Sequence, residues 1–268
     1  MLASLFRLRG ELSTKLSTTV QLTGLFLILG LWSVVSGAEL VPRALLPTPW
    51  SVVGSFSELH YNDALVRNVI YSIKINVLGY LQALVIAIPA GFLVGLLPVC
   101  RELFRRYIDA TRYLPLTALT GLFIAWFGIE DAMKIQFLAF GITVYLLPVV
   151  VQRIYEVEKV YVDTVYTLGA TKWQTVKEIF IPSVLSKVSD DARVLVAISW
   201  TYIIVAELIN KSAGGIGALC YTAARQSRID KVFALLMVIV LIGFIQDKLA
   251  GMLDKMLFPH KHTGAGDK

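Results

Sequence analysis

The chain has 268 residues, of which 56% are hydrophobic and 16% charged, and its mean hydropathy is +0.70. A soluble globular domain carries about 25% charged residues, so this composition excludes an ordinary soluble protein and indicates a membrane protein. The formal net charge of +6 is compatible with nucleic-acid binding. In a membrane protein, however, an excess of Lys and Arg more commonly records topology, and we expect no nucleic-acid partner.

Six apolar stretches are candidates for membrane-spanning helices, each of which needs about 20 mostly apolar residues. The third is short, and the edges of the third and fifth are the least sharply defined. In chain order the stretches are residues 20–41, 70–99, 113–129, 132–151, 194–209 and 232–252. We therefore predict an all-α membrane protein with about six spanning helices.

The first apolar stretch has two interpretations. It follows Arg7, Arg9 and Lys15 and ends near the small residues of the triplet 36–38, a pattern that partly fits a secretory signal peptide. Its apolar run is longer than that of a usual signal, and five further stretches follow. An uncleaved first helix is the favoured interpretation.

The basic residues predict the orientation of the chain. If the N-terminus lies in the cytoplasm, most of the 25 Lys and Arg residues fall on the inner side, as the positive-inside rule requires. Both termini and the segment 152–193 are then cytoplasmic. Cys100 and Cys220 are placed on opposite faces, so we expect no disulfide, and we expect no metal site because the sequence has no Cys/His cluster.

Residues 166–182, YTLGATKWQTVKEIFIP, interrupt the apolar pattern within this cytoplasmic segment. Tyr161, Val165 and Leu168 precede the interruption at helical spacing. Gly169 follows them, and glycine is the residue best suited to a left-handed helix C-cap. The sequence therefore predicts a short helix that ends at this glycine.

A second short helix is expected after the glycine. Thr171 and Gln174 have the spacing of a capping box, and Pro182 is expected to end the helix because the residue before a proline avoids helical angles. Such a helix is about 15 Å long and cannot span a membrane. Its Trp173 side suits either a helix lying at lipid headgroups or a docking surface for a soluble partner.

The spacing of these residues resembles the EAA loop of ABC importer permeases, in which Glu-Ala-Ala, three residues, Gly and nine residues precede Ile-x-Leu-Pro. Here Asp163-Thr164-Val165 is followed by Gly169 and then by Ile179-Phe180-Ile181-Pro182. Gly, Ile and Pro are met literally. Asp replaces Glu, Thr-Val replaces Ala-Ala, and Ile replaces Leu.

Further segments narrow the resemblance to the nitrate, sulfonate, taurine and bicarbonate group of these permeases, over about residues 40–255. The segments that carry it are residues 45–49 (LLPTP), 113–135, 167–185 and 205–217. The resemblance implies a type I importer-like fold in the bacterial cytoplasmic (inner) membrane. A permease domain (20–255) with a coupling loop (152–193) then lies between a cytoplasmic N-terminal segment (1–19) and a cytoplasmic tail (256–268).

The resemblance also implies partners. Such a chain forms half of a pathway, commonly as a homodimer with a second permease copy, surrounded by membrane lipid. Two copies of a separate ATPase subunit dock on the EAA-loop helices, and a periplasmic or lipid-anchored binding protein delivers a small, usually anionic solute. The residues implied in ATPase coupling are Asp163, Gly169, Ala170, Thr171, Lys172, Trp173, Ile179 and Pro182.

The chain itself carries no G-x-x-x-x-G-K-[ST] phosphate loop and no catalytic constellation. We therefore expect it not to be an enzyme and to bind no cofactor, with ATP used by the partner ATPase. The alternative is a secondary transporter or channel that works without ATP. Such proteins often show two related halves, and we find no internal repeat.

Polar and aromatic residues near the spans are the candidates for a substrate pathway or gate. Glu207 is expected either to pair with Lys211 one turn later or to shape an outer gate. Lys74 and Asn76 suit a snorkelling cation and a helix–helix hydrogen bond, or else an anion-attracting lining. Trp126 suits an interfacial anchor or a gate wall. Gly214, Gly215 and Gly217 are expected to form a flexible external turn.

Overall fold

The structure is a computed structural model that describes residues 12–209, 211 and 213–261. Of the predicted terminal segments, residues 1–11 and 262–268 lie outside the described residues. All regular elements within these ranges are helices. The chain divides into two compact units, Met1–Asp63 with Thr222–Ala234, and Ala64–Tyr221 with Leu235–Lys268.

The first unit contains α2 (Thr14–Gly37), α3 (Pro49–Tyr61) and the beginning of α12 (Ile229–Leu257). Thr48 caps α3, because its Oγ1 accepts a hydrogen bond from the Ser51 N–H at 3.3 Å, and proline suits the first helical position. The Trp32 indole donates to the Pro47 carbonyl at 2.9 Å. These two bonds fix the loop between α2 and α3.

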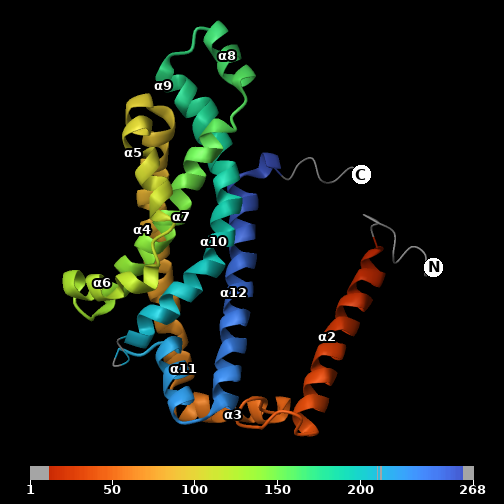
Figure 1. Cartoon of the computed structure of the whole chain (residues 1–268). Coiled ribbons are helices and arrows are strands. Elements are labelled where there is room, and N and C mark those ends of the chain that lie inside the picture. The colour runs from red at the N-terminus through yellow and green to blue at the C-terminus, as the bar shows by residue number, and fades with distance from the viewer. Residues whose placement is uncertain (1–11, 210, 212, 262–268) are drawn as a thin grey trace. The chain divides into compact units, whose positions relative to one another are not determined.

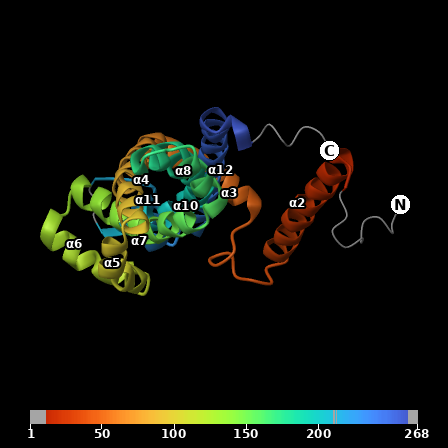
Figure 2. The same cartoon turned by 90° about the horizontal axis from the view of Figure 1, so that it is seen from above.

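The second unit contains most of the remaining helices, and Figures 1 and 2 both show α4, α7 and α10 side by side within it. Its elements are α4 (Leu65–Leu96), α5 (Pro98–Thr111), η1 (Leu116–Leu119), α6 (Thr120–Phe127), α7 (Asp131–Tyr155), α8 (Lys159–Thr167), α9 (Lys172–Thr175), η2 (Val176–Phe180), α10 (Ile181–Ile209), most of α11 (Ile216–Arg225), the rest of α12 and η3 (Pro259–Lys261).

Among the described residues, five helices are long and apolar enough to cross a membrane: Thr14–Gly37, Leu65–Leu96, Asp131–Tyr155, Lys172–Ile209 and Ile229–Leu257. They correspond to five of the six predicted spans, and they confirm the all-α membrane class.

A continuous helix over residues 113–129, the predicted third span, is not present. This region holds the shorter apolar helix Leu116–Phe127. Pro115 precedes its first turn in an extended conformation. Gly128 follows its last turn with φ +75°, a left-handed backbone that glycine adopts at little cost.

The core of the second unit depends on a close approach of α4 to α7. Small residues recur every four positions along α4 and are all buried: Gly79, Ala83, Ala87, Gly91 and Gly95. A Cβ atom added to Gly91 would lie 2.6 Å from Val150 Cβ, and one added to Gly95 would lie 2.5 Å from Ile154 Cδ1. Small residues let membrane helices gain van der Waals contact, and this stripe therefore sets the distance between α4 and α7.

The prediction that Pro182 ends a separate helix is wrong, because α9, η2 and α10 form one continuous helix over Lys172–Ile209. Its turn Val176–Phe180 is a π-helix, and the Ile181 N–H donates to the Val176 carbonyl five residues back. A proline in a regular helix clashes with the carbonyl four residues before it. In the wider π turn just before Pro182, the hydrogen bond runs to the carbonyl five residues back and not four, and Ile181 stays helical at φ −58°.

Candidate functional site

The segment predicted to couple to an ATPase contains α8, α9 and the turn between them. Gly169 has φ +82°, and its N–H donates to the Tyr166 carbonyl at 3.0 Å. The Ala170 N–H donates to the Val165 carbonyl, also at 3.0 Å. This pair of bonds is a Schellman motif, which confirms the predicted glycine cap and fixes the direction of the chain after α8.

The start of α9 carries the predicted capping box. The Thr171 N–H donates to Gln174 Oε1 at 2.8 Å, and the Gln174 N–H donates to Thr171 Oγ1 at 3.3 Å. Each bond satisfies a donor that the first helical turn would otherwise leave without a partner. The turn between α8 and α9 is thus hydrogen-bonded on both sides and is a defined structure.

Several apolar side chains of this element are exposed. Trp173 is 69% exposed and Leu168 is 81% exposed, and Tyr161 and Tyr166 are exposed beside them. Figure 1 shows α8 and α9 projecting beyond the end of α7 and the beginning of α10. Of the eight residues predicted for coupling, six are exposed, and Ala170 and Ile179 are half-buried; the exposed ones are Asp163, Gly169, Thr171, Lys172, Trp173 and Pro182.

The following turn attaches this element to the bundle. Phe180 packs against the buried cluster that includes Val184 and Val188 of α10. Phe180 lies inward and Trp173 is exposed, so these two aromatic side chains have different environments. The indole is turned to the outside of this chain.

An ion cluster braces the base of the element. The Arg153 guanidinium at the end of α7 donates from Nε and Nη2 to the Asp191 carboxylate of α10, at 2.7 and 2.8 Å. Its Nη1 contacts Glu156 Oε2 at 2.7 Å, and this hydrogen bond lowers the pKa of Glu156 below its ordinary value. Two residues further along α10, Arg193 pairs with Asp247 at 3.0 Å.

A second candidate site is built around Glu207, which is fully buried near the end of α10. The Ser72 hydroxyl donates to Glu207 Oε1 at 2.5 Å, and the Gly217 N–H donates to Oε2 at 2.7 Å. Ser72 Oγ also accepts from the Ile216 N–H at 2.9 Å. Residues of α4 and α10 therefore hold the first turn of α11.

The expected ion pair between Glu207 and Lys211 is not present. The Lys211 ammonium lies 3.3 Å from the centroid of the Tyr221 ring instead, where the ring face attracts a cation. The expected flexible turn is likewise a packed structure, because a Cβ atom on Gly215 would lie 2.3 Å from Glu207 Cδ. Only glycine leaves room for the buried carboxylate there, and Gly215 also has φ +110°.

Sequence reasoning missed a polar group next to this site. Lys134 of α7 is fully buried, and its ammonium donates to the Tyr71 hydroxyl at 3.1 Å. That hydroxyl in turn donates to the Asp131 carboxylate. The signal was available, because a lysine inside an apolar stretch is costly and marks a functional or structural contact.

The other pathway candidates have surroundings of their own. Asn76 forms reciprocal hydrogen bonds with Ser199 of α10, at 2.9 and 3.2 Å, which fits the predicted helix–helix bond. Lys74 is exposed, and Trp126 is exposed beside Phe123 and Phe127. The role of these residues in a pathway stays a prediction.

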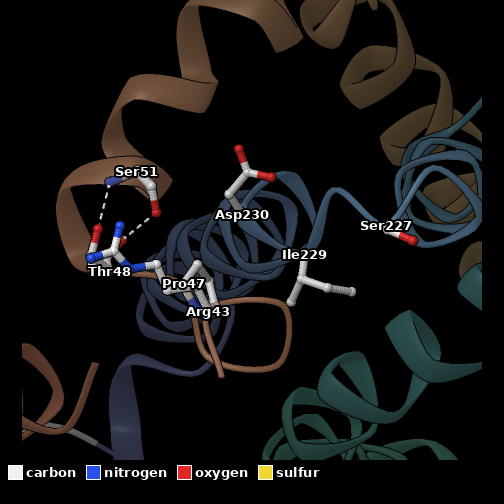
Figure 3. Close-up of a pocket in the computed structure, with 7 residues that line it drawn as sticks. All are labelled: Arg43, Pro47, Thr48, Ser51, Ser227, Ile229 and Asp230. Atoms are coloured by element: carbon white, nitrogen blue, oxygen red, sulfur yellow. Dashed lines mark hydrogen bonds between the residues drawn. The ribbon is translucent and has the colours of Figure 1, made fainter. Parts of the chain in front are cut away.

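The first unit holds a pocket of about 230 Å³ at the beginning of α3 and α12. Figure 3 shows Arg43, Thr48, Ser51 and Asp230 around it, with the two hydrogen bonds between Thr48 and Ser51. Arg43 pairs with Glu39 at 2.7 Å, and Asp230 binds Arg228 through both oxygens. The charges that line the pocket are already matched, so it is a weak candidate for an ionic ligand.

Residues 84–258 match a protein family described as "binding-protein-dependent transport system inner membrane component". The chain is 28% identical over 251 residues to a putative aliphatic sulfonates transport permease protein of Bacillus subtilis (strain 168), a match that covers 89% of this chain and 86% of the relative. It is 25% identical over 258 residues to the taurine transport system permease protein of Escherichia coli (strain K12), covering 94% of each.

Among solved structures, the fold is similar to a chain of the MetNI methionine ABC transporter in an inward-facing conformation. The TM-score is 0.64 at 18% identity, and the match covers 72% of this chain and 95% of that chain. At this identity the likeness shows the fold alone, and it supports the type I importer-like arrangement.

Proposed function

The chain belongs to the family of inner membrane components of binding-protein-dependent transport systems, and from that membership we propose that it is one half of a solute pathway driven by a separate ATPase docked on α8 and α9. Like its sulfonate and taurine permease relatives, it is the permease component of an ABC importer and not an enzyme.

The exposed Trp173 on a capped element carries this proposal. An exposed apolar patch marks a contact with a partner or with lipid, and Trp is enriched in the central contacts of protein interfaces. Both caps restrict the turn between α8 and α9. A partner that grips Trp173 and Leu168 therefore contacts a preformed surface and loses little conformational entropy on binding.

The continuous helix Lys172–Ile209 explains how a push on this patch reaches the membrane. Trp173 lies in the first turn of this helix, and Ser199 and Glu207 lie further along it. A displacement of Trp173 therefore acts on the helix that holds both residues, and Ser199 is hydrogen-bonded to Asn76 of α4. The Arg153–Asp191 ion pair joins α7 to this movement. We propose that closure of the ATPase pair moves α8 and α9 together with α10, and that the pathway alternates between inward-facing and outward-facing states.

The proposed cargo is a small anionic solute of the nitrate, sulfonate, taurine or bicarbonate type. The printed names of two relatives, for aliphatic sulfonates and for taurine, support this class. A periplasmic or lipid-anchored binding protein would deliver the solute. Glu207 is not proposed as a substrate contact, because it is fully buried and both of its oxygens accept hydrogen bonds within the chain.

The experiment is uptake of taurine or an alkanesulfonate into proteoliposomes that contain this chain, its ATPase subunit and its binding protein. We expect uptake that requires ATP, and we expect Trp173→Ala to reduce both uptake and substrate-stimulated ATP hydrolysis at least tenfold, the order expected for loss of an interface residue worth about 2 kcal/mol. The variant should fold normally because its indole is exposed.

The matched control is Trp50→Ala, which removes an indole from α3 that is even more exposed than that of Trp173. It should leave ATP hydrolysis unchanged. ATP-independent uptake by the chain alone would support a secondary transporter or channel instead. Uptake and ATP hydrolysis at wild-type levels in Trp173→Ala would contradict the proposal that the ATPase docks on α8 and α9.

A further inference from the structure

Helix α5 is an amphipathic helix with no fully buried side chain, and the importer mechanism above does not use it. Figure 1 shows it at the same end of the second unit as α8 and α9. Arg101, Arg105 and Arg112 are spaced i, i+4 and i+11, which places them along one face. An exposed apolar stripe, Val99, Leu103 and Tyr107, follows another face.

The arginine face borders a pocket of about 270 Å³ between α5 and the end of α7. One wall of this pocket is apolar and is formed by Val94 of α4 and by Pro148 and Val151 of α7. Gln152 and Tyr155 of α7 also line the pocket. The pocket thus lies where two spanning helices end, and one side of it is apolar while another is basic.

The positive charge in this pocket is largely unmatched. Arg105 and Arg112 are exposed, and within the described part of the chain neither forms an ion pair or a hydrogen bond to another residue. Arg101 donates to the Gly95 carbonyl at 3.1 Å and lies 4.9 Å from the centroid of the Tyr155 ring, and its buried Nε has no acceptor among the described residues. Three guanidinium groups face one carboxylate, that of Asp109.

We propose that this pocket binds the phosphate of an anionic phospholipid headgroup. A guanidinium fork matches phosphate oxygens through two parallel hydrogen bonds, and basic pockets between spanning helices suit anionic headgroups. The apolar stripe on α5 supplies the second half of the site, because an amphipathic helix at the interface buries such a stripe among acyl chains. A free phosphate would use the arginines but not the stripe or the apolar wall.

Native mass spectrometry of the purified full-length chain, titrated separately with short-chain phosphatidylglycerol, short-chain phosphatidylcholine and inorganic phosphate, tests this site. The wild-type chain should bind phosphatidylglycerol more tightly than the other two. The double variant Arg105→Gln with Arg112→Gln should weaken phosphatidylglycerol binding on the order of 30-fold, as expected for two arginines near an anionic headgroup.

Arg106→Gln is the matched control, because Arg106 is exposed on the same helix but does not line the pocket. The affinity of this variant for phosphatidylglycerol should stay within about twofold of that of the wild-type chain, a difference below about 0.5 kcal/mol. If the glutamine double variant does not elute as a folded protein, the double variant Arg105→Lys with Arg112→Lys is used instead, because it keeps the charge. It should bind phosphatidylglycerol more weakly than the wild-type chain does, but more tightly than it binds phosphatidylcholine. Equal binding of the two lipids by the wild-type chain would overturn the proposal. Inorganic phosphate binding as tightly as phosphatidylglycerol, with the same arginine dependence, would overturn the lipid assignment.

Discussion

The packing of α4 on α7 makes a sharp prediction at Gly91. In Gly91→Ala, the new Cβ would lie 2.6 Å from both Cβ and Cγ1 of Val150, closer than atoms of this kind approach. Val150 is buried and β-branched, so its side chain has no alternative rotamer into which it can withdraw easily. Overpacking of this kind costs about 1–3 kcal/mol, whereas alanine is favoured over glycine inside a helix by about 1 kcal/mol. The net expectation is a destabilisation of about 1 kcal/mol.

Gly243→Ala is the matched control, because Gly243 lies inside the spanning part of α12 with nothing within 4 Å of the added Cβ. There only the helix preference remains, and the free energy of unfolding should rise by up to about 1 kcal/mol. The assay is denaturant unfolding of both variants in the same micelles. A stabilised Gly91→Ala would refute the reasoning, because it would mean that α4 and α7 do not approach each other as closely as the structure has them.

Two further predictions concern polar contacts. A double-mutant cycle of Asn76→Ala and Ser199→Ala should give a coupling energy of about 0.6 kcal/mol, typical of a hydrogen bond between membrane helices, measured by the same unfolding assay; additive single effects would contradict the bond. The pKa of Glu58 lies below its ordinary 4.5, because Arg228 and then Lys231 hydrogen-bond its carboxylate. A carboxyl group whose pKa is lowered by folding stabilises the protein at a pH above its unfolded-state pKa, and this stabilisation is lost as the pH falls through its folded-state pKa. Glu58→Gln should therefore flatten the fall of the thermal unfolding midpoint below about pH 4.5. An unchanged dependence of the midpoint on acidic pH would contradict the ion pair.

Local chemistry made the turn between α8 and α9 predictable from sequence. Gly169, Thr171 and Gln174 act through hydrogen bonds to residues at most five positions away, so their spacing alone determines the motif. The five long spans were predictable for a similar reason, because a run of about 20 apolar residues is a property of composition.

Pro182 shows where local rules are insufficient. The residue before a proline disfavours helical angles, but a π turn immediately before it and the packing of Phe180 on α10 outweigh that preference. The helix continues because tertiary contacts stabilise it. No short-range pattern in residues 166–182 indicates that balance.

The Glu207 site was out of reach for a different reason. Sequence spacing offers Lys211 as a partner one turn away, whereas the observed partners are Ser72 and Gly217, and Ser72 lies 135 positions away in the chain. Only the packing of α4 against α10 brings them together. Lys134 is an exception, because its position within an apolar stretch was a visible signal.

The central claim, that α8 and α9 hold the ATPase, is tested most directly by cross-linking. Both native cysteines, Cys100 and Cys220, are free and can be replaced by Ser, so that Trp173→Cys and Trp50→Cys each carry a single thiol. In membranes that contain the co-expressed ATPase subunit, a bifunctional thiol-to-amine reagent should join the chain to the ATPase from position 173 and not from position 50. Absence of a cross-link from position 173, or equal cross-linking from both positions, would contradict the account.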